Sequence, residues 1–288
     1  MTIDLHIHSK NSDGKLTVSE IFNEAKARNI SFLAITDHDS IGCQPQAKAQ
    51  AKQAGIRYLC GVELNVTFSH PKYREGKATS LDFLGYNFDP NNKELKEKLE
   101  VVAKYREERA AKILENLNAE FSKEGIPKLT GADFAEIEAS VDGVLGRPHI
   151  ADFLVKKKIV ATRQEAFDKY LVRCDVPKYP VYLQEASALV RNAGGKLILA
   201  HPNDPHGTSL NSLTKSLLEQ TQIIQDSMLQ FIDGVECWHS RNDAATTEHY
   251  VRFAKERGLL MTGGSDCHQK PILMGTVNVP EYVAKQFP

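Results

Sequence analysis

Two histidines stand one residue apart near the start of the chain, in the stretch MTIDLHIHSKNSDG, and Asp13 follows shortly after them. Because side chains alternate across a β-strand, His6 and His8 point to the same side if this apolar stretch is a strand. Two imidazoles near a carboxylate form either an ordinary polar face or part of a metal site. The choice between these depends on the rest of the chain.

Metal-capable side chains recur at other apolar stretches, which end in AITDHD, CGVEL, LILAHP and GGSDCH, while another contains SLDFLGY. In a parallel α/β barrel the C-terminal ends of the strands meet at one face, and that face carries the chemistry. The sequence therefore predicts a ring of imidazoles and carboxylates around one mouth. Its candidate members are His6, His8, Asp13, Asp37, His38, Glu63, Asp82, His201, Asp266 and His268.

This set of donors indicates a particular chemistry. Imidazole and carboxylate without a thiolate pattern favour Mn, Fe or Zn in a reactive site over a structural zinc finger. A bridging carboxylate can hold two metals about 3.5–4 Å apart, a geometry suited to in-line attack on phosphorus. Such metals generate hydroxide near neutral pH and neutralise charge on phosphoryl oxygens.

The elements that must position these residues can also be predicted. Helical patterns lie between several apolar stretches; one has Thr17 as N-cap with Glu20 completing a capping box, and two others end at Gly55 and Gly258. Strands alternating with helices predict a parallel α/β sheet or barrel. The predicted strands are Ile3–Ile7, Phe32–Thr36, Arg57–Leu64, Ser80–Tyr86, Lys196–Ala200, Gly234–Trp238 and Leu259–Thr262.

The middle of the chain has a different pattern. From about Asn91 to Leu189 the sequence is helical in character, with a long charged segment whose leucines and isoleucines recur near helical spacing. We therefore predict a barrel formed by residues 1–90 and 190–288, interrupted by a small helical domain at residues 91–189 that acts as a lid.

The overall composition narrows the classes of partner. The 288 residues carry a formal net charge of −1, so no global basic field attracts duplex DNA or a membrane. No apolar stretch approaches the roughly 20 residues of a membrane span, and the first residues lack a signal-peptide pattern. Five scattered cysteines without a CxxC pair are typical of reduced thiols, which predicts a cytoplasmic protein. Nothing in the sequence identifies a protein partner.

In this order, HIH with Asp13, TDH, GVE, AHP and SDCH resemble the motifs of the polymerase and histidinol phosphatase (PHP) superfamily. The resemblance spans nearly the whole chain and implies a distorted (β/α)7 barrel with three divalent metal ions. It implies a first metal at His6, His8, Glu63 and Asp266, a second at Glu63 and His201, and a third at Asp13, His38 and His268, with Asp13 and His38 among the catalytic residues.

One position departs from that pattern. Members of the superfamily usually have a histidine in the fourth strand, in a stretch like HILGY, whereas this chain has DFLGY with Asp82 in that place. A carboxylate can bind a metal, which would give the second site a harder ligand set. Alternatively His70 supplies the imidazole, or the second metal is weak or absent. We take Asp82 as the predicted ligand.

A second signature lies inside the helical region. GRPHIA, at Gly146–Ala151, looks like a subfamily of nucleoside bisphosphate and monophosphate phosphatases and 5′–3′ exoribonucleases. In that resemblance, Arg147 and His149 bind the substrate and serve as catalytic residues. Arg147 can bind phosphate with two hydrogen bonds, and His149 can donate a hydrogen bond or a proton to the leaving oxygen.

The sequence thus predicts a metal-dependent phosphoesterase that removes terminal phosphate from a nucleotide or acts on the 5′ end of short single-stranded RNA. Hydrolysis of histidinol phosphate or another small phosphomonoester is the alternative within the same class. An alternative of another class is a metal-binding scaffold without catalysis. Loss of nucleotide activity in Arg147→Ala separates the first two, and phosphatase turnover with added Mn excludes the third.

Several neighbouring residues have more ordinary interpretations. Asp37 is expected to orient a metal ligand, and Asp39 to cap the following helix. Glu236 could equally support a ligand or lie at the surface. We expect structural or surface roles for His206, His239 and His249, a side chain pointing away from the site for Cys267, and either a solvated helix face or a lid for Arg106 and Arg109.

Overall fold

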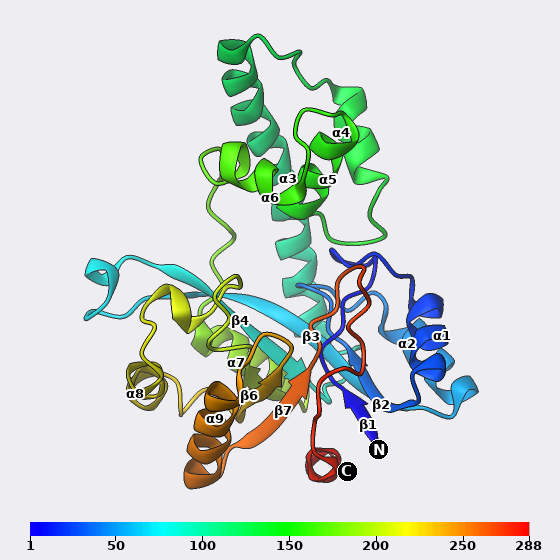
Figure 1. The fold of residues 1–288 in the computed structure, drawn as a ribbon, viewed down its shortest axis with the longest axis vertical. Helices are drawn as coiled ribbons and strands as arrows, with labels where there is room; N and C mark the ends of the chain where they lie inside the picture. The colour runs from blue at the N-terminus through cyan, green and yellow to red at the C-terminus, as the bar shows by residue number, and fades with distance from the viewer. Residues whose placement is uncertain (288) are drawn as a thin grey trace.

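A single sheet of seven strands, in the spatial order β1 to β7, organises the computed structural model, which describes residues 1–287 (Figure 1). Each of the seven stretches predicted from the sequence overlaps one of these strands. The strands are β1 (Thr2–Asp4), β2 (Ile30–Ile35), β3 (Arg57–Phe68), β4 (Thr79–Tyr86), β5 (Lys196–Leu199), β6 (Gly234–His239) and β7 (Leu260–Gly264).

The two edges of the sheet meet just beyond β1 and β7. The amide of Leu5 donates to the carbonyl of Gly263 at 3.1 Å, and Ile7 forms a parallel bridge with Cys267. These contacts curl the sheet toward a barrel, as the sequence predicts. They also bring the residues that follow β1 beside those that follow β7.

The prediction of a parallel sheet is wrong at β4, which runs antiparallel to both β3 and β5. No α-helix lies between β3 and β4, only a short connection with the 3₁₀ turn η1 (Arg74–Gly76), and parallel neighbours need a longer crossover. As a result Asp82 lies in the interior of β4, opposite Asn65 of β3, rather than at a C-terminal strand end.

Helices cover the outside of the sheet, and their ends agree with the sequence. Thr17 and Glu20 form the capping box that begins the first helix, and Gly55 and Gly258 end two others in the left-handed conformation. Asp39 is not a cap, because Cys43 occupies that position. The helices are α1 (Val18–Ala27), α2 (Gln44–Ala54), α7 (Leu183–Asn192), α8 (Leu217–Ser227) and α9 (Ala244–Arg257), with short turns η3 (Leu210–Ser212) and η4 (Glu281–Gln286).

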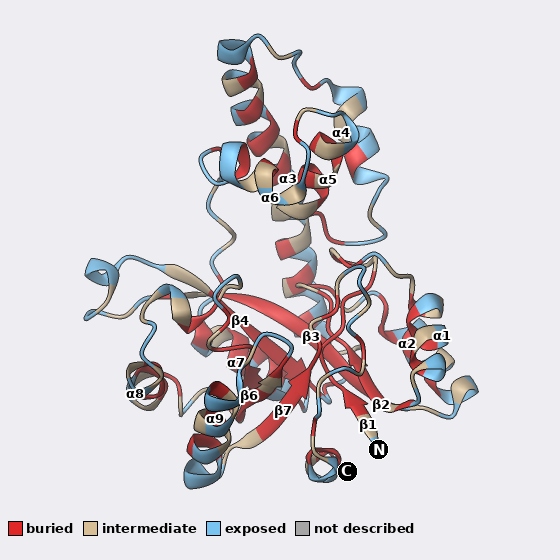
Figure 2. Ribbon diagram, viewed as in Figure 1, coloured by how far each residue is buried: buried red, intermediate tan, exposed pale blue. Residues whose placement is uncertain are grey.

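The helical region stands above one end of the sheet, at the top of Figure 1. The long helix α3 (Lys93–Glu124) joins the two parts: Leu95 and Leu99 pack into the apolar core around the sheet, whereas Leu117 and Phe121 belong to a separate apolar cluster. Figure 2 shows buried residues on both halves of this helix. The separate cluster also includes residues of α4 (Gly131–Glu138), α5 (Arg147–Lys156), α6 (Arg163–Ala166) and η2 (Phe167–Leu171).

Within residues 1–287, no helix is both long enough and apolar enough to cross a membrane.

Candidate metal centre

The predicted ring of polar residues forms one cluster at the end of the barrel beneath the helical region. His6 and His8 follow β1, His201 follows β5, and Asp266 and His268 follow β7. His201 and Asp266 have positive φ angles of 23° and 54°, which few residues other than glycine adopt. Such backbone conformations persist where the surroundings enforce them, and they concentrate at functional sites.

Glu63, a buried residue of β3, lies at the centre of this cluster. Its Oε2 atom is 3.3 Å from His6 Nε2 and 3.1 Å from His8 Nε2. The same oxygen is 3.1 Å from Nδ1 of His38, while Oε1 is 3.0 Å from Nε2 of His201. Glu63 therefore directs its two oxygens at different imidazoles, the arrangement that a bridging carboxylate requires.

Asp266 completes the first group of ligand atoms. Its Oδ1 atom lies 3.4 Å from His6 Nε2 and 3.3 Å from His8 Nε2. One ligand atom from each of His6, His8, Glu63 and Asp266 falls within 4.8 Å of all the others. These four residues are the set that the family resemblance implies for the first metal.

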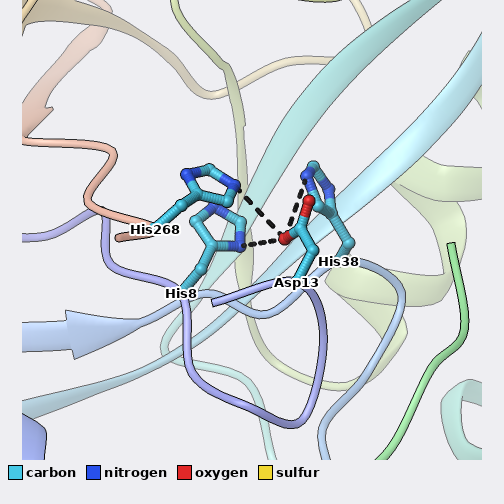
Figure 3. A group of neighbouring side chains, drawn as sticks. All are labelled: His8, Asp13, His38 and His268. Carbon is cyan, nitrogen blue, oxygen red and sulfur yellow. Dashed lines mark ion pairs between the residues drawn. The ribbon is translucent and has the colours of Figure 1, made fainter. Parts of the chain in front are cut away.

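Asp13 gathers a second group of imidazoles, shown in Figure 3. Its Oδ1 atom is 3.2 Å from His268 Nε2, 3.8 Å from His8 Nδ1 and 4.0 Å from His38 Nε2. The ring of His268 also stacks on that of His8, with centroids 3.9 Å apart. The structure thus brings together the three residues predicted for the third metal, together with His8.

The donor atoms of this cluster suit a divalent metal because many of them are buried without a hydrogen bond. Buried polar atoms in native proteins are almost always hydrogen-bonded, and each exception needs an explanation. A metal ion that accepts lone pairs from several of these atoms at once supplies it. Within residues 1–287, the buried atoms of the cluster that lack a hydrogen-bond partner include His6 Nε2, His8 Nε2, Asp13 Oδ1, Glu63 Oε2 and Asp266 Oδ1.

The electrostatics of the cluster follow from burying imidazoles among carboxylates. Burial lowers the pKa of His8, but Asp266 and Glu63 outweigh burial and raise it to about 10. Burial also lowers the pKa of His201, but Glu63 outweighs burial and raises it to about 9. Although burial raises the pKa of the Asp13 carboxyl, His268 and the neighbouring imidazoles hold it well below its usual range. Without metal, these imidazoles therefore retain protons that a metal would displace.

Two further carboxylates, Glu236 and Asp37, hold residues of the cluster in position by hydrogen bonds. Glu236 of β6 lies 3.1 Å from Nδ1 of His6 and accepts a hydrogen bond from the backbone amide of His201 at 2.8 Å. Asp37 accepts three hydrogen bonds from Ser9 and Ser12, which precede Asp13. A carboxylate on the far nitrogen of an imidazole fixes its tautomer and raises its basicity. Glu236 is buried, so the surface alternative for it is wrong.

Asp82 is buried at the edge of the cluster. The Nδ2 atom of Asn65 donates to Oδ1 of Asp82 at 2.5 Å, and the Thr208 hydroxyl donates to Oδ2. One Asp82 oxygen also falls within 4.8 Å of ligand atoms from His38 and Glu63. By contrast, His70 accepts a hydrogen bond from the amide of Lys72 in an exposed loop.

A cavity of about 400 Å³ opens onto the cluster. Its inner wall includes Asp13, Glu63, Asp82 and Asp266. The outer wall combines Pro148, Arg163 and Phe167 of the helical region with the loop after β7, including Lys270 and Leu273, and the loop after β5, including His206. The cavity therefore lies between the barrel mouth and the helical region, with the cluster on its inner wall.

Sequence reasoning missed two residues near this cluster. His239 Nε2 lies 3.4 Å from Oδ2 of Asp266, although we expected a structural or surface residue. Arg241 lines the cavity and pairs with buried Asp204. His239 and Arg241 come at the end of β6, the strand-end position that led to the other candidates. That signal could have identified them.

The two residues of the GRPHIA signature lie at the edge of this arrangement. Arg147 Nη1 donates to Asp175 at 2.6 Å, and its guanidinium lies 5.5 Å from the centroid of Phe167. His149 is buried against the backbone carbonyl of Ser12. Of residues 1–287, those that line the cavity include Pro148 between the two but neither Arg147 nor His149. Their predicted roles on substrate remain predictions.

Basic residues gather between α3 and the barrel. Arg106 pairs with Asp39, the residue that follows His38, while Arg109 and Arg147 share Asp175. Burial lowers the pKa of Arg106, but Asp39, and more weakly Asp13 and Asp82 of the cluster, raise it overall.

Lys178 lies among these guanidinium groups. Burial lowers its pKa to about 8, and repulsion from Arg106 and Arg147 adds to this shift, although Asp82 opposes it. Arg106 and Lys178 therefore lie close enough to Asp82 of the cluster to interact with it electrostatically, and Arg147 lies near Lys178.

Comparisons with known proteins agree with this geometry. A family model described as the PHP domain matches residues 4–173. A 5′–3′ exoribonuclease of Haemophilus influenzae is 30% identical over 92% of this chain and 89% of its own length. A 3′,5′-nucleoside bisphosphate phosphatase of Chromobacterium violaceum is 29% identical over 92% of this chain and 87% of its own. The crystal structure of a protein from Bifidobacterium adolescentis, assigned as a metal-dependent phosphoesterase, superimposes with a TM-score of 0.80 at 27% identity, covering 99% of this chain and 94% of that one.

Proposed function

The chain belongs to the PHP domain family, and we propose that it removes a terminal phosphate from nucleotides or acts on the 5′ end of short RNA, as the names of a nucleoside bisphosphate phosphatase and an exoribonuclease among its relatives suggest. The observation that carries this proposal is the buried cluster around Glu63. Its nitrogen and oxygen atoms without a hydrogen-bond partner lie close together at the floor of the cavity.

We assign three divalent ions, Mn, Fe or Zn, to this cluster. The first would be held by His6, His8, Glu63 and Asp266, and the third by Asp13, His38 and His268, because their ligand atoms converge. The second would lie between Glu63, His201 and Asp82. The metals, when bound, supply a Lewis acid that activates water and neutralises charge on the phosphoryl oxygens. Glu236 and Asp37 keep His6 and the Asp13 loop in position for them.

Substrate recognition in this proposal comes from the basic residues beside the cluster. Arg147 and Arg106 present guanidinium groups, which bind phosphate with paired hydrogen bonds, and Lys178 adds a third positive charge. Arg147 shares Asp175 with Arg109, and Lys178 has no carboxylate partner among the ion pairs of residues 1–287, so a phosphate can compete for these two side chains. Arg106 would have to exchange its contact with Asp39 for one with phosphate. Phe167 and Leu273 offer apolar surface for a nucleoside at the outer wall of the cavity. The names of the two relatives, a nucleoside bisphosphate phosphatase and an exoribonuclease, support a nucleotide substrate.

Asp82 is the proposed third ligand of the second metal. Its contacts with Asn65 and Thr208 fix the carboxylate and leave lone pairs on both oxygens. The metal content of Asp82→Ala separates the alternatives: we expect one ion fewer per chain than in the unaltered protein. Unchanged content in Asp82→Ala, with one ion lost in His70→Ala, would favour the loop histidine instead.

All five cysteines are free and buried, which suits a reducing compartment, and we propose that the enzyme acts in the cytoplasm.

Phosphate release from a panel of substrates tests the proposed function. Metal-free protein is reloaded with Mn²⁺ and given AMP, 3′,5′-adenosine bisphosphate, a 5′-phosphorylated short RNA and histidinol phosphate, with Asp13→Ala as the blank. The RNA is also assayed for released mononucleotides. We expect turnover of at least one nucleotide or RNA substrate that the blank lacks. Turnover of histidinol phosphate alone would contradict the substrate class, and no turnover with metal bound would favour a scaffold.

A further inference from the structure

The loop that carries Asp13 lies between the barrel and the helical region. It runs from Ser9 to Lys15, between the histidines that follow β1 and the start of α1. Its end is tied to the loop after β7, because the amide of Lys15 donates to the carbonyl of His268 at 2.7 Å. Asp13 can bind a metal only while this loop keeps its conformation.

The barrel holds one side of the loop. Asp37 accepts hydrogen bonds of 2.7 Å from the amide and from the hydroxyl of Ser9, and a third of 2.7 Å from the hydroxyl of Ser12. Hydrogen bonds to an ionised carboxylate are about twice as strong as those between neutral groups. The side chains of the loop are therefore fixed from the barrel.

The helical region holds the other side through the backbone. The amide of Asp142 donates to the carbonyl of Lys10, and that of Val144 to the carbonyl of Asn11, both at 2.9 Å. Gly143 between them has no side chain, and a Cβ there would lie 2.3 Å from the Asn11 carbonyl oxygen. The contact is thus closer than any other residue at position 143 would allow.

His149 adds the contact nearest to Asp13. Its Nε2 atom lies 2.9 Å from the carbonyl oxygen of Ser12, the residue before Asp13. Its Nδ1 atom accepts a hydrogen bond of 3.0 Å from the amide of Gly146. A neutral imidazole that accepts at Nδ1 carries its hydrogen on Nε2, so His149 donates to the Ser12 carbonyl. Both ring nitrogens are thereby occupied by backbone groups.

We infer that His149 is a positioning residue, which fixes the Ser12 carbonyl so that Asp13 can hold its metal, and that docking of the helical region onto this loop sets the affinity of that metal position. The inference deepens the proposed function and rests on it. It differs from the sequence prediction that His149 donates a hydrogen bond or a proton to the leaving oxygen of the substrate. Both nitrogens of His149 have backbone partners, and the residues lining the cavity within 1–287 do not include it.

Four variants separate this role from a general effect on folding. His149→Phe keeps a planar ring without a donor, and His149→Gln restores an N–H group near the position of Nε2. Gly143→Ala disturbs the same docking at a different residue. Gly131→Ala is the matched control in the same helical region, because a Cβ there meets nothing within 4 Å. The Asp13→Ala variant identifies the ion that belongs to the Asp13 position.

The measurement is Mn²⁺ content per chain at a series of free Mn²⁺ concentrations, with thermal unfolding recorded for each variant. Loss of a residue that orients a metal ligand typically weakens metal binding about 10- to 100-fold. We expect such weakening in His149→Phe and Gly143→Ala, only for the ion that Asp13→Ala lacks. We expect recovery in His149→Gln and no change in Gly131→Ala.

Three results would overturn the inference. Wild-type affinity in both His149→Phe and Gly143→Ala would show that docking does not control the Asp13 position. Equal loss of every ion would indicate general unfolding. Normal metal affinity in His149→Phe, combined with lost turnover and a lost limb of the pH–rate profile, would assign His149 to proton transfer instead. If the unaltered protein binds no Mn²⁺ or Asp13→Ala loses none, the proposed metal centre fails as well, which distinguishes the two failures.

Discussion

The mouth of the barrel and the helical region above it contribute to the same site by different physical means. At the mouth, the position of each side chain follows from a strand end: His6 and His8 share a face, and Glu63 and Asp266 meet them across the sheet. In the helical region, Arg147 and His149 depend on partners far away in the sequence, Asp175 and Ser12. The first kind of position follows from periodicity along the chain, and the second only from tertiary packing.

The two regions also differ in charge. The mouth concentrates buried imidazoles and carboxylates whose donor atoms have no hydrogen bond, which suits cations. The neighbouring region supplies Arg106, Arg147 and Lys178, which suit the phosphate of a substrate. This comparison predicts that changes at the mouth abolish metal binding, whereas changes in the helical region alter substrate binding or a single metal position.

The largest effect is expected for Glu63→Gln at the mouth. The amide keeps the size of Glu63 but loses the charge that faces four imidazoles, so more than one metal should be lost. We expect kcat/KM to fall by at least ~10³-fold, which corresponds to about 4 kcal/mol of transition-state stabilisation. Metal content by mass spectrometry and phosphate release check this.

Glu185→Gln, which alters a partly exposed carboxylate paired with Lys98 away from the mouth, is the control and should behave like the unaltered protein. A Glu63→Gln protein with full metal content and turnover would remove the bridging carboxylate from the account.

A smaller effect is expected for Arg147→Ala in the helical region. A hydrogen bond to a charged group contributes about 1.5–3 kcal/mol, so KM for a nucleotide should rise about 10- to 100-fold with the metal content unchanged. Steady-state kinetics on the preferred nucleotide measure this. Arg173→Ala, a half-exposed arginine of the same region paired with Glu124, is the matched control. Loss of metal in Arg147→Ala would break the division between the two regions.

Metal binding should depend on pH because histidines at the barrel mouth are protonated in the metal-free protein. The pKa values of His8 and His201, about 10 and about 9, mean that a metal must displace protons from both near neutral pH. Apparent affinity should therefore rise about tenfold per pH unit for each proton displaced. Calorimetry in buffers with different ionisation heats counts the protons released, and a count of zero would contradict the raised pKa values.

The same protons affect the stability of the metal-free protein in the opposite direction. His8 and His201 have a higher pKa in the folded protein, about 10 and about 9, than the value of about 6.5 in the unfolded chain. Their contribution to the free energy of unfolding is therefore complete below about pH 6.5 and is lost as the pH rises to the folded-state pKa values. The free energy of unfolding of metal-free protein should therefore fall between pH 7 and pH 10. An Asp13→Ala protein, which lacks one carboxylate of the cluster, should show a weaker dependence.

The smallest effect is expected for Thr17→Ala, on a barrel helix outside the mouth. Loss of this N-cap should lower the free energy of unfolding by about 1 kcal/mol while metal content and kinetics stay unchanged. Chemical denaturation checks the stability. A loss of metal in this variant would mean that the Asp13 loop depends on α1, and not only on Asp37 and the helical region.

Much of the fold could be predicted from local pattern. The seven strands, the Thr17 capping box and the C-terminal glycines Gly55 and Gly258 all follow from short stretches of sequence, and all are present in the structure. The antiparallel direction of β4 could not be predicted in this way, because direction depends on the connection between strands. That direction is also why Asp82 belongs to the mouth although it does not end a strand.

The site shows the same division. Residues at strand ends, such as His201 and His268, were predicted to belong together, and the structure places them around Glu63 and Asp13. The pairing of Arg106 with Asp39 was not predicted, because it joins a helix of one region to a loop of the other. The spacing of residues along the chain does not predict such a contact.

The spectrum of bound Mn²⁺ tests the central claim most directly, namely that one carboxylate-bridged cluster at the barrel mouth holds the metals. Ions about 3.5–4 Å apart across a bridging carboxylate are magnetically coupled, and isolated ions are not. We predict that electron paramagnetic resonance of the Mn²⁺-loaded protein gives a coupled signal, which Glu63→Gln abolishes. A spectrum of isolated Mn²⁺ ions only, or a coupled signal that survives in Glu63→Gln, would contradict the account.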